Sequence, residues 1–124
     1  MNILIVDDWE DIGVLLRRNI VKHLHHVKVE QVLDIPDAPQ AIERLQPHIV
    51  VLDVRLPSGS GLGLIQFVKR LLPEAKVIMF TGYADLRTER SAMDLGADYF
   101  FYKSDDYEKF VETVTELIPA PHEV

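Results

Sequence analysis

Five polar side chains each follow a short apolar run, and their types suit phosphate and metal chemistry. Asp7 and Asp8 follow ILIV, Asp53 follows IVVL, Thr81 follows VIMF and Lys103 follows YFFY. Two carboxylates about 5 Å apart repel by roughly 3 kcal/mol at an effective dielectric constant of about 20, so carboxylates that share one site require a cation. Oxygen ligands without His or Cys favour a hard ion such as Mg²⁺, which also binds phosphate.

The elements that must position these side chains can be read from the apolar pattern. The four apolar runs are rich in β-branched and aromatic residues, as buried strands are. A fifth run, VKVEQV at residues 27–32, alternates apolar and polar residues, which is typical of a strand at a sheet edge. Apolar residues recur at helical spacing between the runs, over residues 38–45, 64–72, 85–95 and 107–118. The stripe over 85–95 is the thinnest, so we expect this helix to be held least firmly.

This alternation of strands and helices predicts an α/β fold. Short connections between parallel strands require helical crossovers on both faces of the sheet. With the alternating strand at an edge, the simplest arrangement is a flavodoxin-like, doubly wound, five-stranded parallel sheet of order 2-1-3-4-5. Ligands of such sheets bind beyond the carboxyl ends of the strands, where the strand order reverses. The five polar side chains are therefore expected to converge at that edge.

Composition limits the class of protein. A chain of 124 residues, 48% of them hydrophobic, forms one domain, which we expect to span residues 1–119 with a short disordered tail at 120–124. The absence of cysteine excludes disulfides and thiolate chemistry. A formal net charge of −7 argues against direct binding of nucleic acid or of an anionic membrane. No apolar stretch approaches the ~20 residues of a membrane span, so we expect no membrane insertion and a cytoplasmic location.

Each of these side chains also has a purely structural explanation. Asp8 could cap the following helix, Thr81 could begin a turn, and a single lysine is usually solvated. A structural account has no use, however, for three carboxylates at one end of a sheet. The joint placement therefore favours a functional site.

These residues resemble the receiver domain of two-component response regulators, and the resemblance covers the whole chain. The matching segments, in family order and spacing, are IVDD, LDVRLPSGSG, FTG and GADYFFYK. The resemblance implies a phosphoacceptor that takes a phosphoryl group from a histidine kinase or a histidine phosphotransfer protein in a Mg²⁺-dependent reaction. The implied roles are phosphoacceptor for Asp53, Mg²⁺ ligands for Asp7, Asp8, the Asp53 side chain and the Arg55 carbonyl, and phosphoryl binding for Thr81 and Lys103.

The resemblance also implies a switch. Thr81 would move to bind the phosphoryl group, and Phe100, three residues before the conserved lysine, would turn inward with it. Phe100 could equally be an ordinary core aromatic. The resemblance implies that downstream proteins bind the face formed by the fourth helix, the fifth strand and the fifth helix. Because the chain ends soon after its last helix, we expect output through protein binding, with no enzyme activity beyond autophosphorylation and autodephosphorylation.

The chain departs from the family after the lysine, where a proline is common and Ser104 stands instead. A cis bond before a non-proline residue costs about 3 kcal/mol or more, so we expect the Lys103–Ser104 bond to be either trans or strained, with Ser104 capping the last helix. Arg55 and Tyr83 follow the conserved aspartate and threonine by two residues. They are expected to shield the acyl phosphate from water and slow its hydrolysis.

Three other functions compete with this interpretation. A haloacid-dehalogenase-type phosphatase also uses an aspartate nucleophile with Mg²⁺, but it requires a second aspartate at position 55, which is arginine here. A scaffold that has lost phosphorylation would not need all five polar residues. A phosphorelay intermediate, which passes the group on to a histidine, cannot be separated from a terminal output device by sequence.

Overall fold

Strands and helices alternate along the chain in this computed structural model, which describes residues 1–83 and 85–119. The main sheet contains β1 (Asn2–Val6), β2 (Lys28–Val32), β3 (Ile49–Leu52), β6 (Lys76–Thr81) and β7 (Tyr99–Tyr102). The helices are α1 (Asp11–Asn19), α2 (Ala38–Leu45), α3 (Gly63–Leu71), α4 (Leu86–Leu95) and α5 (Tyr107–Leu117). Smaller elements are the 3₁₀ helices Val21–His23 and Ile35–Asp37 and the strands β4 (Arg55–Leu56) and β5 (Gly59–Ser60).

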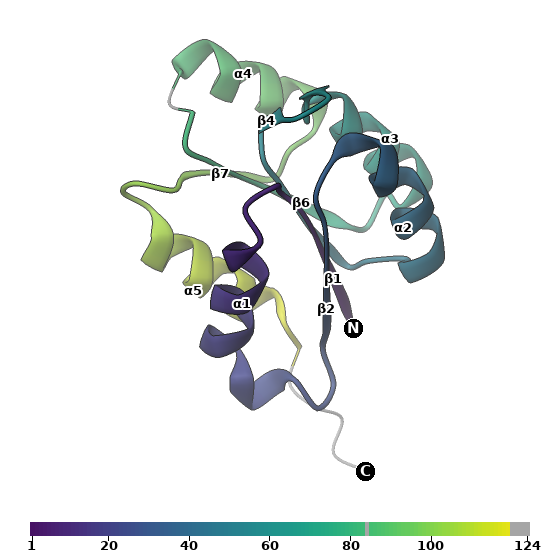
Figure 1. The fold of residues 1–124 in the computed structure, drawn as a ribbon, viewed down its shortest axis with the longest axis vertical. Helices are drawn as coiled ribbons and strands as arrows, with labels where there is room; N and C mark the ends of the chain where they lie inside the picture. The colour runs from purple at the N-terminus through teal and green to yellow at the C-terminus, as the bar shows by residue number, and fades with distance from the viewer. Residues whose placement is uncertain (84, 120–124) are drawn as a thin grey trace.

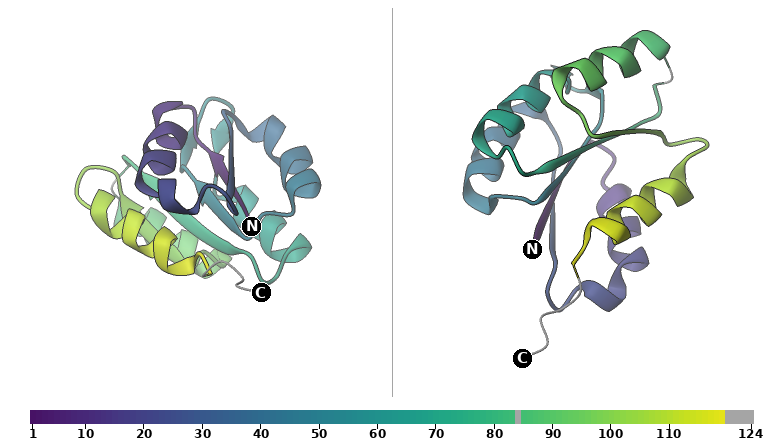
Figure 2. Two further views of the ribbon diagram at one scale, coloured as in Figure 1. Left: turned by 90° about the horizontal axis from the view of Figure 1, so that it is seen from below. Right: turned by 180° about the vertical axis from the view of Figure 1, so that it is seen from behind.

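The five strands of the main sheet are parallel and lie in the order β2-β1-β3-β6-β7. Counted along the sheet-forming strands, this is the predicted order 2-1-3-4-5, so the expected flavodoxin-like fold is confirmed. Helices α1 and α5 cover one face, and α2, α3 and α4 cover the other (Figure 1). The views from below and behind show the same three layers (Figure 2).

Burial explains why the central strands read as continuous apolar runs. Successive side chains of β1 point to opposite faces, so Ile3 and Ile5 join the core under α1 and α5, while Leu4 and Val6 join the core under α2, α3 and α4. All four are completely buried. The edge strand β2 instead starts with exposed Lys28 and buried Val29, as its alternating sequence predicts.

The cap expected at Ser104 and the alternative explanation of Asp8 as a cap are both wrong. Helix α5 has Asp106 as its N-cap residue and not Ser104, because the chain continues in a turn after β7 before the helix begins. Helix α1 follows Glu10, so Asp8 lies too early to cap it. The described residues contain no cis peptide bond, and the Lys103–Ser104 bond is therefore trans.

Three further expectations concern other parts of the chain. The proposed disordered tail, 120–124, lies outside the described residues. None of the helices in the described part of the chain has the length and apolar character needed to cross a membrane. The thin anchoring expected for α4 is confirmed, because Ala92 is its one buried residue.

Candidate functional site

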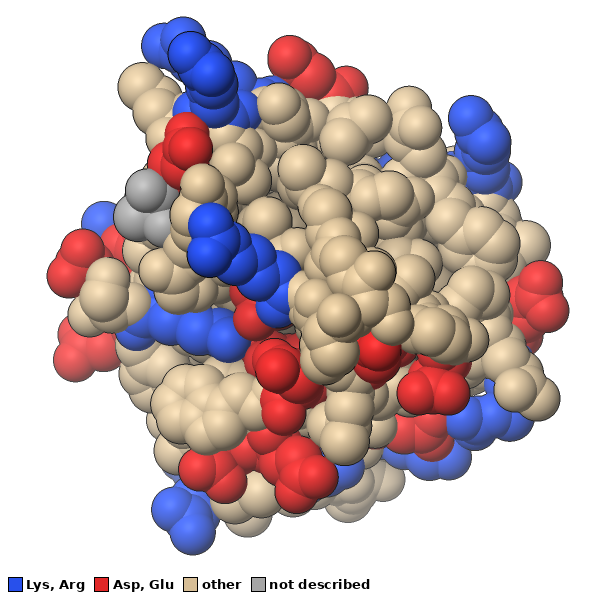
Figure 3. Space-filling model, turned by 45° about the horizontal axis from the view of Figure 1, so that its top comes forward, with Lys and Arg blue, Asp and Glu red and all other residues tan. Residues whose placement is uncertain are grey.

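Three carboxylates converge at the carboxyl edge of the sheet. Because β1 and β3 are neighbours in register, Val6 pairs with Leu52 and the next residues, Asp7 and Asp53, lie side by side. One oxygen each of Asp7, Asp8 and Asp53 lies within 4.8 Å of the others. Acidic side chains gather in the middle of this end of the molecule, with basic side chains directly beside them (Figure 3).

The three acids differ in their access to water. Asp7 is 1% exposed and Asp53 is 7% exposed, whereas Asp8 is an exposed residue. Buried carboxylates lose hydration and require compensating charges or hydrogen bonds. Asp7 receives one such bond through its Oδ1 from the Trp9 backbone N–H, at 2.9 Å.

Lys103 supplies the nearest positive charge. Its Nζ lies 2.7 Å from Asp7 Oδ2 and 3.1 Å from Asp53 Oδ2, so one ammonium bridges acids from two strands. Its backbone N–H donates to the Thr81 carbonyl at 2.8 Å, which aligns the ends of β6 and β7. Lys103 and Thr81 thus lie at the same edge of the sheet as the acids, and their roles there stay a prediction.

The acidic cluster contains more negative than positive charge. Burial raises the pKa of Asp7, a shift that the nearby Asp53 carboxylate reinforces and that Lys103 only partly opposes. Burial alone would lower the pKa of Lys103, but contacts with Asp7 and Asp53 outweigh it and raise that pKa. Three carboxylates face one ammonium, and an all-oxygen donor set of this kind fits a hard divalent cation.

A depression of about 280 Å³ opens beside Asp53. Arg55 and Tyr83 lie at its rim, with the Arg55 guanidinium carbon 3.6 Å from the centre of the Tyr83 ring. The Tyr83 backbone N–H donates to Thr81 Oγ1 at 3.1 Å. A cation–π contact of this kind holds the two side chains together in the wall of the depression. The depression is lined by Asp53, Arg55, Thr81, Gly82, Tyr83 and Lys103.

The loop after β3 carries Arg55 and is fixed by contacts that sequence reasoning missed. Strands β4 and β5 pair Arg55 with Ser60 in a short antiparallel hairpin. A Cβ at Gly61 would lie 2.1 Å from the Asp53 carbonyl oxygen, so glycine is required at this position. Asp34, at the end of β2, accepts hydrogen bonds from both the backbone N–H and the hydroxyl of Ser58. Asp34 and Ser58 are 24 positions apart in the sequence, where no local pattern could connect them.

Phe100 lies in β7 on the side of the sheet covered by α4. It is half-buried, packs against the core on that face, and meets the Tyr102 ring edge-on with centroids 5.4 Å apart. The Tyr102 hydroxyl in turn donates to Glu89 of α4 at 2.8 Å. This geometry fits both the switch role and the ordinary core role, so the switch stays a prediction.

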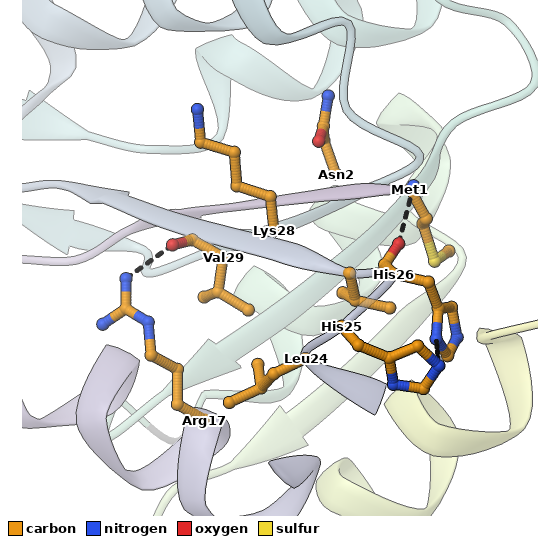
Figure 4. A pocket seen from close by; sticks show the side chains of 9 residues that line it. Met1, Asn2, Arg17, Leu24, His25, His26, Lys28 and Val29 are labelled. Carbon is orange, nitrogen blue, oxygen red and sulfur yellow. Dashed lines mark hydrogen bonds between the residues drawn. The ribbon is translucent and has the colours of Figure 1, made fainter. Parts of the chain in front are cut away.

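A second depression lies at the opposite end of the sheet, near the N-terminus (Figure 4). Its basic side chains do not surround a common point. Lys28 points away from one side of β2, and Arg17 of α1 lies on the other side. The Arg17 guanidinium donates a hydrogen bond to the Val29 carbonyl. His25 and His26 contact each other, with ring nitrogens 3.1 Å apart. This arrangement carries none of the chemistry of the acidic site.

Comparisons with known proteins agree with the fold and the acidic site. The family model described as "Response regulator receiver domain" matches residues 3–115. The chain is 28% identical to protein CcdB of Bacillus subtilis, over 94% of this chain and 96% of that protein. It is 32% identical to the response regulator protein PilR of Pseudomonas aeruginosa, over 93% of this chain but only 25% of that longer protein.

A solved structure shows the same architecture. A response regulator protein from Burkholderia pseudomallei, described with a phosphorylated aspartic acid, a calcium ion and citrate, superposes with a TM-score of 0.77 at 26% identity. The match covers 93% of this chain and 71% of that one. The acidic cluster of Asp7, Asp8 and Asp53 fits the metal site of a receiver domain. The chain belongs to the family of response regulator receiver domains, the phosphoacceptor signalling modules of two-component systems.

Proposed function

We propose that Asp53 accepts a phosphoryl group from the phosphohistidine of a histidine kinase or a histidine phosphotransfer protein. The observation that carries this proposal is the placement of Asp53 beside both Lys103 and the acidic pair, in the lining of an open depression. The Asp53 carboxylate would attack phosphorus in line, the bond from phosphorus to the histidine nitrogen would break, and an acyl phosphate would form.

The acids and one backbone carbonyl would hold the metal ion. Asp7, Asp8, the Asp53 side chain and the Arg55 carbonyl are the proposed ligands, and the exposed position of Asp8 leaves room for water in the coordination shell. Bound Mg²⁺ would supply the counter-charge that lets a carboxylate approach an anionic phosphoryl group.

Lys103 and Thr81 would receive the transferred group. The Lys103 ammonium, already 3.1 Å from Asp53, can contact a phosphoryl oxygen by a small movement and neutralise charge in the transition state. Thr81 is 1% exposed, and its hydroxyl accepts a bond from the Tyr83 N–H. Reorienting this hydroxyl toward a phosphoryl group would pull on the loop between β6 and α4.

That movement would reach a protein-binding surface. Helix α4 is anchored to the core through a single buried residue and exposes Leu86 and Met93, which are 59% and 43% exposed. We infer that phosphorylation shifts α4 and the Phe100 ring, and that downstream proteins bind the face formed by α4, β7 and α5. The half-burial of Phe100 supports this, because a ring without a hydroxyl can enter the core without burying a polar group.

Phosphotransfer profiling tests the proposal. A panel of phosphorylated histidine kinases is mixed with the wild-type chain and with Asp53→Asn, and transfer is followed over time. We expect fast transfer from at least one kinase to the wild-type chain and none to the variant. Transfer to both proteins at equal rates would overturn the assignment of Asp53. Onward transfer to added histidine phosphotransfer proteins would identify a relay intermediate.

A further inference from the structure

A glutamine on the edge strand holds the segment that carries the acidic pair. Gln31, half-buried in β2, donates from Nε2 to the carbonyl oxygens of Asp7 at 2.7 Å and Trp9 at 2.9 Å. Its Oε1 accepts from the Gly13 backbone N–H at 3.0 Å. Two carbonyls at one end and one N–H at the other leave only one orientation of the amide that satisfies all three bonds.

The contact with Gly13 meets a need of helix α1. The first backbone N–H groups of a helix have no partner within it, and a side chain at the N-cap residue usually supplies one. Glu10 is the N-cap residue of α1 and makes no such bond. Gln31 therefore caps α1 from the neighbouring strand, while the same amide group holds the segment that precedes the helix.

The Gln31 amide can approach position 13 because glycine has no Cβ. A Cβ at position 13 would lie 2.7 Å from Gln31 Oε1, closer than two such atoms approach each other. The φ angle of Gly13 is not positive, so backbone conformation does not explain why glycine stands at this position. The glycine and the amide thus fit together, since any larger residue would push the Gln31 side chain away.

The amide contacts bracket Asp8. The Asp7 and Trp9 carbonyls, one on each side of Asp8 along the chain, bind the same Nε2 group. We propose that Gln31 is a positioning residue, which fixes Asp8 beside Asp7 so that both can bind one divalent cation. The inference rests on the proposed function, because it assigns Gln31 to the same metal site. A neutral amide can do this without adding a negative charge to the cluster.

The test measures Mg²⁺ binding, with the change in Trp9 fluorescence as the readout. Trp9 is 49% exposed and its ring lies 5.6 Å from Lys103 Nζ, so it reports on this site. Removal of groups that orient metal ligands typically weakens binding 10–100-fold, and we expect about tenfold for Gln31→Leu. The matched control is Gln66→Leu, on the exposed surface of α3, which should leave the titration midpoint unchanged.

Two further variants separate positioning from charge and from folding. Gln31→Glu adds a negative charge near the site, which by attraction alone would tighten Mg²⁺ binding. It places a carboxylate against two carbonyl oxygens, however, so we expect weaker binding than in the wild type. Gly13→Ala improves helix propensity, which offsets the loss of the cap, so this variant should fold. It displaces the amide, however, and should also weaken binding.

The Mg²⁺ titrations of these variants test the role of Gln31 separately from the proposed function. Midpoints within twofold of the wild type for Gly13→Ala and for folded Gln31 variants would overturn the positioning role while the metal site itself stands. Tighter binding by Gln31→Glu would also overturn it. A wild-type chain that shows no response to Mg²⁺ would remove both the proposed function and this inference. Faster hydrogen exchange at the Gly13 amide in metal-free Gln31→Leu is the accompanying structural change that we expect.

Discussion

Replacing Lys103 with methionine removes the ammonium that bridges two buried acids. Its Nζ lies 2.7 Å from Asp7 and 3.1 Å from Asp53. Methionine keeps much of the aliphatic length of lysine, so the change removes mainly charge. The carboxylates of β1 and β3 would then face each other with no partner of opposite sign between them.

The expected loss of stability follows from burial. The side chains of Asp7, Asp53 and Lys103 are 1%, 9% and 16% exposed. Removing one partner of a buried ion pair costs about 3–5 kcal/mol, and the lower value applies because Lys103 retains some contact with water. We therefore expect metal-free Lys103→Met to lose about 3 kcal/mol, or about 12 °C in Tm at about 4 °C per kcal/mol.

Thermal and urea unfolding in EDTA, repeated with saturating Mg²⁺, measure this effect. Added Mg²⁺ should stabilise Lys103→Met more than the wild type, because the ion replaces the missing positive charge. Lys109→Met is the matched control: that lysine is 73% exposed and 3.8 Å from Asp106, so its loss should change stability by about 0.5 kcal/mol or less. A Lys103→Met variant that unfolds within about 1 kcal/mol of the wild type in EDTA, or equal stabilisation of both proteins by Mg²⁺, would show that the ammonium does not offset the buried carboxylates.

Three other changes probe neighbouring parts of the site. Burial raises the pKa of Asp7, so ionisation of this carboxyl destabilises the folded protein as pH rises through the folded pKa. Asp7→Asn should therefore be more stable than the wild type in EDTA at neutral pH. Urea titrations should show this advantage disappear below the ordinary pKa of 3.8. Gly61→Ala, whose Cβ would meet a backbone carbonyl at 2.1 Å, should lose about 2 kcal/mol or more, whereas Gly63→Ala, in open space, should lose nothing in the same assay. Alanine at Arg55 or Tyr83 should shorten the lifetime of the acyl phosphate several-fold, and an unchanged decay rate would exclude shielding by these side chains.

Much of the site was predictable because its side chains end neighbouring parallel strands. The apolar run 49–52 fixes where β3 stops, so Asp53 necessarily stands at the carboxyl edge, next to the acids that end β1. The same logic placed Thr81 and Lys103. Periodicity also located α4 and its weak attachment, since the helix has few apolar residues to bury.

Contacts between distant polar residues were not predictable. The bond from Ser58 to Asp34 and the three bonds of Gln31 depend on side-chain reach across the fold, which leaves no trace in apolar spacing. The hairpin of β4 and β5 was missed because two-residue strands are too short to show alternation. The cap predicted at Ser104 failed for a related reason: a turn separates β7 from α5, and Asp106 is the residue at the N-cap position.

Phosphorylation of Asp53 should depend on a divalent cation held by Asp7 and Asp8. Intact-mass measurement after incubation with acetyl phosphate tests it most directly, with and without Mg²⁺, on the wild-type chain and on Asp53→Asn. We predict a mass increase of one phosphoryl group that requires Mg²⁺, disappears on acyl-phosphate cleavage with hydroxylamine, and is absent from the variant. A wild-type chain that gains no mass with Mg²⁺ present, or a variant that gains as much as the wild type, would contradict phosphorylation at Asp53.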